Sequence, residues 1–368
     1  MLAKIVATLV LSAVTLAALP VYIGTSGGDS KGIYRADFNP LTGKLSQPAL
    51  VAEYLNPGFL ALHPRKPILY AIGQPRTAFP DGTSSVAAFI IKGDRPLEFI
   101  SEASTGGQGA CHLAVDATGR TVAAANYSDG TISTLPLDEN GKPGMIATLI
   151  THHGSGPNQS RQAGPHAHGV YFDRANRHLF VPDLGVDQVL IYPFDAQSST
   201  LGEALPPLTT APGAGPRHLA FSPDDKNAYI INELDATIIT ATHQLGTLTA
   251  LSKVSTLPED FTERKSTAEI EVHPNGEFVY ASNRGYDSIV VFQRDTTTGT
   301  LTLVQHAPCG GKTPRHFKID PTGKWLLCAH QDSDTISVLS LDPVTGLLGK
   351  PTHTVSAPHP ICLLFAPF

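Results

Sequence analysis

One short phrase recurs along this chain at intervals of about fifty residues. Its clearest copy is Gly-Pro-Arg-His-Leu-Ala-Phe-Ser-Pro-Asp at 215–224, and each weaker copy keeps a polar residue just before an apolar run. These polar marker residues are His112, His168, His218, Glu269 and His316, separated by 56, 50, 51 and 47 positions. A nearly constant period of this size is typical of an array of like structural units.

Each repeat contains three or four short apolar runs rich in β-branched residues. In the repeat around His218, the turn Ser222-Pro-Asp-Asp is followed by runs at Ala228–Ile231 and Thr237–Thr240. Such runs, bounded by Pro, Gly, Asn and Asp, are strands joined by hairpins, and no stretch after residue 20 keeps a helical period over three turns. The pattern predicts an all-β chain whose repeats are propeller blades; a stacked solenoid usually has shorter repeats with parallel strands.

The number of blades follows from the inner-strand phrases. Six such phrases begin near Phe59 and the five marker residues, whereas the unit after Val21 has later strands but no inner strand before it. The segment Ala357–Ala366 at the C-terminus supplies the missing phrase. We therefore predict a seven-bladed β-propeller, a single domain over 19–368, closed by a C-terminal strand that joins the N-terminal blade and removes the open sheet edges.

The first eighteen residues have a different character. Lys4 precedes an apolar run, Ile5–Leu19, with small residues at Ala17 and Ala18. This is the pattern of a secretory signal, and the run is short for a membrane span. We expect residues 1–18 to be a signal peptide and the protein to be periplasmic or secreted; if 1–18 is not a signal, the protein is cytoplasmic.

Charge and cysteine usage limit the partners. A net charge of −6 disfavours nucleic acid and, beyond the export signal, a membrane surface. The four cysteines show neither a C-x-x-C pair nor zinc spacing, so we expect no metal and no cofactor. Cys111 and Cys362 are expected to be buried free thiols, and a bridge between Cys328 and Cys362 stays open.

Polar residues of the repeats are expected to meet at one mouth of the central channel. In a propeller the inner strands begin, and the second strands end, on the same face, where loops carry function. Arg217, Arg284 and Arg315 fall there, together with Glu233 and several histidines. Clustered guanidiniums on an acidic protein favour a small anionic molecule that carries a carboxylate or a phosphate.

Structural roles compete with this interpretation. On a regular strand Arg217 and His218 point to opposite faces, and so do Arg315 and His316, so only one of each pair can face the channel. His112 and His316 could instead hydrogen-bond a neighbouring blade, and Asn126 fits turn chemistry equally well. The histidines lie on different blades, which argues against a metal site.

Several motifs resemble those of a known family. They are Tyr22-Ile-Gly-Thr, Cys111-His-Leu-Ala-Val-Asp, Ala125-Asn-Tyr, Pro165-His-Ala-His, Gly215-Pro-Arg-His, Asn232-Glu-Leu, Ala281-Ser-Asn-Arg-Gly and Thr313-Pro-Arg-His-Phe. Together they resemble the lactonase family of seven-bladed propellers, which includes propeller-type 6-phosphogluconolactonases and carboxy-cis,cis-muconate cyclases. The resemblance covers about Val21 to Phe365 and leaves residues 1–18 outside.

The resemblance also implies site residues. Cyclase members use one His, two Arg and one Glu, which fall on His168, Arg217, Glu233 and Arg284 as catalytic candidates. His166 competes with His168, and the segment His152–Pro165 is expected to reach over the mouth. The expected substrate-binding residues are Arg161, His166, His218, Glu269, Arg315, His316, His112 and Asn126.

The function expected from these residues is metal-independent hydrolysis of a sugar-acid lactone, with a small anionic lactone or sugar acid as partner. Either Glu233 or His168 would be the base, which the sequence leaves open. A 3-carboxy-cis,cis-muconate lactonising cyclase is the second expectation. A non-catalytic propeller that binds a ligand or partner is the third, because a fold alone does not fix function.

Overall fold

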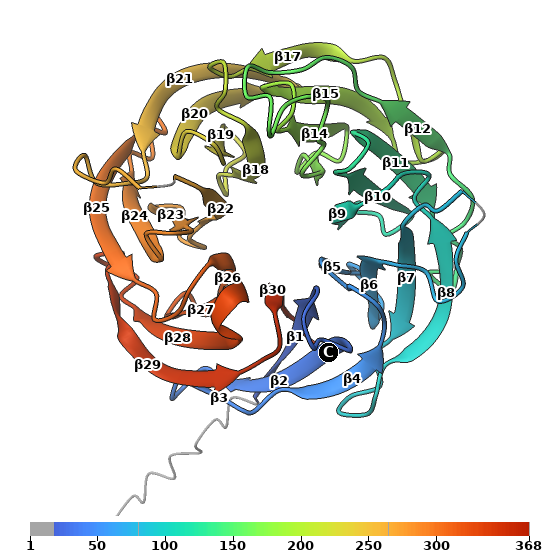
Figure 1. Ribbon diagram of the computed structural model, residues 1–368, viewed down its shortest axis with the longest axis horizontal. Coiled ribbons are helices and arrows are strands. Elements are labelled where there is room, and N and C mark those ends of the chain that lie inside the picture. Colours follow the sequence, from blue (N-terminus) through green and yellow to red (C-terminus); the bar gives the residue numbers. More distant parts are fainter. Residues whose placement is uncertain (1–17, 80, 264, 368) are drawn as a thin grey trace, which may run out of the picture.

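The computed structural model describes residues 18–367, apart from residues 80 and 264. Within them, seven antiparallel sheets of four or five strands stand around a central channel (Figure 1). The helical content of this part of the chain is one 3₁₀ turn, η1 (Gln331–Ser333), and no helix here is long and apolar enough to cross a bilayer. The all-β, seven-bladed prediction is confirmed; the predicted signal segment lies outside the described residues except for Ala18.

The blades follow one another around the ring, as the colours of Figure 1 show. Three consecutive blades consist of β5 (Leu60–Leu62), β6 (Ile68–Gly73), β7 (Ser85–Ile90) and β8 (Glu98–Ser104); β9 (Ala110–Val115), β10 (Thr121–Asn126), β11 (Thr131–Pro136) and β12 (Thr148–Thr151); and β13 (Tyr171–Phe172), β14 (His178–Asp183), β15 (Gln188–Asp195), β16 (Thr200–Leu201) and β17 (Leu205–Thr209). The next three consist of β18 (Pro216–Phe221), β19 (Asn227–Asn232), β20 (Thr237–Gln244) and β21 (Thr247–Ser255); β22 (Thr267–Val272), β23 (Phe278–Asn283), β24 (Ser288–Arg294) and β25 (Leu301–Pro308); and β26 (Pro314–Ile319), β27 (Trp325–His330), β28 (Thr335–Leu341) and β29 (Leu348–Ser356).

The seventh blade joins the two ends of the chain. It contains β1 (Leu19–Thr25), β2 (Gly32–Asn39), β3 (Lys44–Leu45), β4 (Ala49–Glu53) and, innermost, β30 (Pro360–Phe365). Strand β30 pairs antiparallel with β1, with Val21 opposite Phe365 and Ile23 opposite Leu363. The expected closure by a C-terminal strand is confirmed, and the ring has no open edge between its first and last blades.

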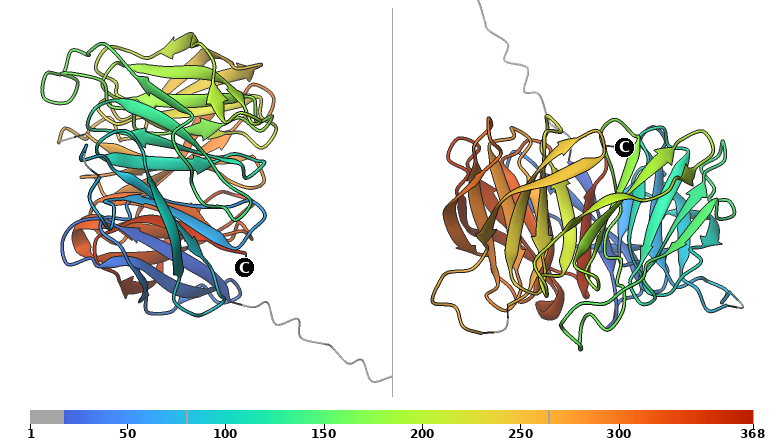
Figure 2. Two further views of the ribbon diagram at one scale, coloured as in Figure 1. Left: turned by 90° about the vertical axis from the view of Figure 1, so that its right-hand side faces the viewer. Right: turned by 90° about the horizontal axis from the view of Figure 1, so that it is seen from above.

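Packing between blades explains the sequence pattern of the second strands. Strands β6, β10, β19 and β23 are buried along their whole length, because the residues of each belong alternately to two apolar cores, one on either face. Figure 2 shows the ring of sheets from two sides. The sequence of a strand that is buried on both faces is a continuous apolar run, without alternating polar residues. These runs form the interblade cores, and the inner strands stay free to carry polar side chains into the channel.

A repeated tyrosine fastens successive blades. The hydroxyl groups of Tyr70, Tyr229 and Tyr280 each donate a hydrogen bond of 2.8–2.9 Å to a backbone carbonyl in the next blade. The acceptors belong to glycines in the hairpin turns, which have φ between 72° and 83°. Glycine adopts this left-handed conformation without a steric penalty, so each turn can present its carbonyl to the tyrosine.

Candidate active site

A cavity of about 580 Å³ occupies one mouth of the channel. Its floor comes from the inner strands and its side from the segments 74–79 and 81–84 between β6 and β7. Among the residues that line it are Cys111, His168, Arg217, His218, Arg315 and His316. All six come from the repeated inner-strand phrases of four blades, and Arg217 and Arg315 place positive charge in the cavity.

Neighbouring residues on the inner strands line the cavity together. Strand β18 has a bulge between Pro216 and His218, and β26 has one between Pro314 and His316. A bulge adds a residue on one strand and re-aims the side chains beside it. Arg217 and His218 therefore both line the cavity, and so do Arg315 and His316. The expectation that only one member of each pair faces the channel was wrong, because it assumed regular alternation.

Arg315 is the uncompensated cation of the cavity. Its guanidinium makes no ion pair or hydrogen bond with any residue in the described part of the chain. Burial, together with the nearby Arg217 and Arg284 guanidiniums, lowers the pKa of Arg315 to about 9. A guanidinium presents several donors to a carboxylate or phosphate, so this side chain is available to an anionic ligand.

Glu233 is enclosed by three arginines next to the cavity. Its carboxylate lies 2.6 Å from Nη2 of Arg161, 3.2 Å from Nε of Arg217 and 2.9 Å from Nη2 of Arg284. Burial raises the pKa of Glu233, but the Arg284, Arg217 and Arg161 guanidiniums outweigh it and hold the pKa at about 2. Three cations against one anion leave an excess of positive charge, and the ionised carboxylate is a weak base.

Backbone carbonyls fix two of these guanidiniums. Arg217 donates from Nη1 to the carbonyl of Ala268 over 2.6 Å, and Arg284 donates from Nε to the carbonyl of Thr267 over 3.1 Å. Both acceptors lie on β22, so the arginines are held in place before any ligand arrives. Arg217 lines the main cavity, whereas Arg284 lines a shallow neighbouring one.

The segment His152–Pro165 carries Arg161 to the channel mouth, as expected. A hydrogen bond of 2.6 Å from His152 Nδ1 to Asp183 anchors its start. Near its end, Gln162 donates from Nε2 to the Leu184 carbonyl over 2.9 Å and to Asp187 over 2.8 Å. These buried anchors hold the segment, so the Arg161 guanidinium is fixed beside Glu233.

The two histidines of the Pro-His-Ala-His motif lie in different surroundings. His168 lines the cavity, and burial, followed by Arg217, His218 and Arg315, holds its pKa well below the ordinary value, so its imidazole is neutral. His166 instead stacks on the Tyr127 ring, with centroids 4.4 Å apart, and its Nδ1 lies 2.7 Å from the Tyr127 carbonyl. Of the two, His168 lines the main cavity and His166 does not.

A layer of rings divides the channel. The ring of Phe59 lies 4.1 Å from that of His112, 6.0 Å from that of His218 and 5.6 Å from that of His316. Below this layer a second cavity of about 360 Å³ is lined by His112 and Glu269. Glu269 approaches His218 at 3.1 Å and His316 at 3.3 Å from that side. His112 and Glu269 therefore line the far cavity, away from Arg217 and His168.

Asn126 has a structural position. Its side chain is fully buried, donates to Thr131 Oγ1 over 3.0 Å and to the Thr105 carbonyl over 3.4 Å, and does not line the main cavity. Asn126 was expected either to bind substrate or to stabilise a turn, and these contacts are those of a turn residue. Two residues were missed as part of the site: Tyr127 accepts a 3.2 Å hydrogen bond from Arg161, and Cys111, which was expected to be buried, is partly exposed because it lines the cavity.

The long segment between β6 and β7 was also missed as part of the site. Pro75, Phe79 and Thr83 on it line the cavity. In the next blade the equivalent turn between β10 and β11 covers only 127–130, whereas this one spans 74–84. That extra length was a readable signal of a binding loop.

The family model for seven-bladed β-propeller lactonases matches residues 20–365. The chain belongs to this lactonase family. The identification made from the motifs, and the expectation of a lactonase-class enzyme, are confirmed.

Similar proteins support this membership. A 6-phosphogluconolactonase of Bacillus subtilis is 34% identical over 348 residues, 94% of this chain and 97% of that protein. A 6-phosphogluconolactonase of Formosa agariphila is 34% identical over 78% of this chain and 82% of its own. Among solved structures, the periplasmic gluconolactonase PpgL of Pseudomonas aeruginosa superposes with a TM-score of 0.90 at 29% identity, over 95% of this chain and 99% of that one.

Proposed function

We propose that this protein hydrolyses the lactone of an anionic sugar acid in the cavity lined by His168, Arg217 and Arg315. The observation that carries the proposal is the neutral imidazole of His168 in the same cavity as Arg315, whose guanidinium has no partner among the described residues. The two named phosphogluconolactonase relatives support the reaction class. The excess of guanidiniums around Glu233 favours a substrate with an anionic substituent.

In the proposed mechanism His168 takes a proton from water as the water oxygen attacks the lactone carbonyl carbon. Arg315 and Arg217 stabilise the oxyanion that forms on the carbonyl oxygen. The tetrahedral intermediate then breaks the ring carbon–oxygen bond, and the imidazolium of His168 returns the proton to the leaving alkoxide. One side chain thus serves as base and then as acid, and the product is the open hydroxy acid.

Substrate binding would also make His168 a stronger base. Burial sets most of its low pKa, but Arg217 and Arg315 contribute. An anionic substrate that pairs with these guanidiniums offsets their charge, so the pKa of His168 rises toward the range useful at neutral pH. Glu233, with a pKa of about 2, is assigned to positioning the arginines and not to accepting the proton.

Two sugar-acid lactones are the candidate substrates. 6-Phosphogluconolactone carries the dianion that the surplus guanidiniums favour. Unphosphorylated gluconolactone would suit an exported protein, and the periplasmic gluconolactonase neighbour supports that choice. We infer export from residues 1–18; N-terminal sequencing of the native protein should then begin near Leu19, and a native chain that keeps Met1 would contradict export.

The decisive experiment measures three reactions of the purified full-length protein. Base uptake at constant pH follows the hydrolysis of 6-phosphogluconolactone and of gluconolactone above the uncatalysed rate, and ultraviolet absorbance follows the loss of 3-carboxymuconate. Faster opening of either lactone supports the proposal. Turnover of the muconate alone would assign the cyclase reaction instead, and tight binding of a lactone without turnover would assign a binding protein.

A further inference from the structure

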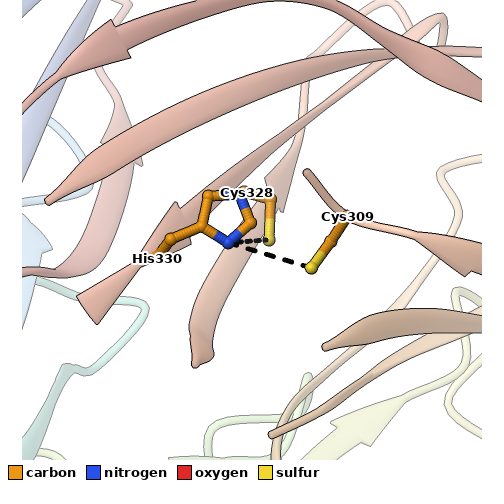
Figure 3. A group of neighbouring side chains, drawn as sticks. All are labelled: Cys309, Cys328 and His330. Carbon is orange, nitrogen blue, oxygen red and sulfur yellow. Dashed lines mark hydrogen bonds between the residues drawn. The ribbon is translucent and has the colours of Figure 1, made fainter. Parts of the chain in front are cut away.

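A second group of reactive side chains lies away from the channel. Cys309 follows β25, and Cys328 and His330 lie on β27 of the next blade (Figure 3). All three are fully buried, and one ligand atom from each lies within 4.8 Å of the others. Residues 328 and 330 are two apart on a strand, so both side chains point to the same face, toward Cys309. None of the three lines the main cavity.

The hydrogen bonds around Ser337 fix the state of the imidazole. Its hydroxyl donates to the Cys309 carbonyl over 2.7 Å and lies 2.8 Å from Nε2 of His330. A serine hydroxyl has one proton, so toward His330 the oxygen accepts and Nε2 carries the hydrogen. The lone pair of His330 Nδ1 then points at the two sulfur atoms, 3.8 Å from Cys309 and 4.0 Å from Cys328.

We propose that Cys309, Cys328 and His330 form a buried binding site for a thiophilic d¹⁰ metal ion, Zn²⁺ or Cu⁺. Thiolate and imidazole are the ligands that these ions select. With metal–sulfur and metal–nitrogen bonds of about 2.3 and 2.0 Å, a trigonal centre has a sulfur–nitrogen edge of about 3.7 Å. The separations in this group are close to that edge, so a central ion requires only small shifts.

The surroundings are those of a built site. A ligating histidine characteristically donates its second ring nitrogen to a fixed acceptor, and Ser337 provides that acceptor. In the metal-free thiol, Cys309 donates to the Asp287 carbonyl over 2.9 Å. On binding, both thiols lose their protons to solvent and both sulfurs bond the ion. No electron is transferred, and the ion joins two blades.

The sequence-based expectations about these cysteines change accordingly. All four cysteines are free, and Cys328 lies beside Cys309 and His330, whereas Cys362 packs in a different interblade core with Tyr22 and Leu60. The Cys328–Cys362 bridge that had stayed open is therefore absent from this part of the chain. The sequence did not reveal this group, because Cys309 and Cys328 come from different blades and their spacing matches no metal-binding motif.

The test is the metal content of the full-length protein, expressed in medium with added zinc or copper and dialysed against a weak chelator. We expect about one ion per chain, and the two media show which ion is held. Cys309→Ser and Cys328→Ser should reduce the content at least about tenfold, whereas the matched control Cys362→Ser, another buried thiol, should keep it. Ser337→Ala should weaken binding by about 10–100-fold.

A second measurement uses only the wild-type protein, so it does not depend on whether the variants fold. In the wild-type protein under mildly denaturing conditions, Cys309 and Cys328 should be alkylated in the metal-stripped sample but protected in the metal-loaded one, whereas labelling of Cys362 should be equal in both, as read by peptide mass spectrometry. Metal content well below one per chain, or equal content in all cysteine variants, would overturn the proposal. A Cys309–Cys328 disulfide in the metal-supplemented protein would also overturn it and would indicate a redox pair.

Discussion

The guanidinium of Arg161 lies 2.6 Å from the carboxylate of Glu233, although 72 positions separate the two residues. This contact joins the segment His152–Pro165 to the end of β19, which Glu233 follows. It closes a cluster in which Arg217 and Arg284 already hold the same carboxylate. Glu233 is therefore the shared counterion of three guanidiniums, and its replacement should affect the whole mouth of the channel.

Glu233→Gln should destabilise the fold as well as slow the reaction. The amide keeps the shape but leaves three guanidiniums without their counterion, and breaking a buried ion pair costs about 3–5 kcal/mol. Chemical denaturation should show a loss of about 3 kcal/mol in the free energy of unfolding. The exposed Glu203→Gln is the control; equal stability of both variants would contradict this account of the cluster.

The same carboxylate should make stability depend on acid. Its pKa is about 2 in the fold against an ordinary 4.5, so its stabilisation is complete above pH 4.5 and is lost as the pH falls toward 2. Wild-type melting temperatures should drop through this window, and those of Glu233→Gln should drop less. Parallel curves for the two proteins would show that the arginines do not hold the carboxylate ionised.

His168→Gln should lower kcat for lactone opening by about 10²–10⁴-fold, the usual contribution of a positioned acid–base group. The matched control is His353→Gln, because His353 lies on outer strand β29, away from the main cavity, and its Nε2 lies 2.8 Å from the Leu45 carbonyl. Steady-state kinetics with far-ultraviolet circular dichroism would separate lost chemistry from lost folding. An unchanged kcat in His168→Gln would show that a different residue is the general base.

Arg315→Met should reduce kcat/KM by about 10²–10³-fold, because it removes a donor aimed at developing negative charge. Folding should not suffer, since Arg315 has no ion pair to lose in the described part of the chain. Arg65→Met is the comparison: Arg65 is exposed and bonds the Thr118 carbonyl, away from the cavity. Equal kcat/KM for these two variants would exclude Arg315 from the site.

Deleting the chain from Pro360 onward should abolish soluble monomer. The deletion removes β30, the innermost strand of the closing blade, and exposes the backbone edge of β1. Open edges template association with other chains. Size-exclusion chromatography should find aggregate, while removal of Phe368 alone should leave the elution position unchanged; a soluble monomeric truncation would show that closure is dispensable.

The sequence pattern predicts the order of the strands, but it does not predict where each side chain lies along and around the channel. The repeated phrase around His218 encodes strand order, so blade number and closure were predictable. It does not encode bulges, which is why Arg217 and His218 were expected on opposite faces although both line the cavity. Depth along the channel axis was also hidden, so His112 and Glu269 were grouped with residues on the other side of the ring layer.

The ring layer built from Phe59 and three histidines lies between the main cavity and the far one. Phe59 and His316 line both cavities, so their rings stand between the mouth and the opposite end of the channel. If the lactone is opened in the main cavity as we propose, this arrangement favours release of the acid through the mouth by which the lactone entered. Departure of the charged product past the arginines of the mouth would then contribute to the rate of successive turnovers.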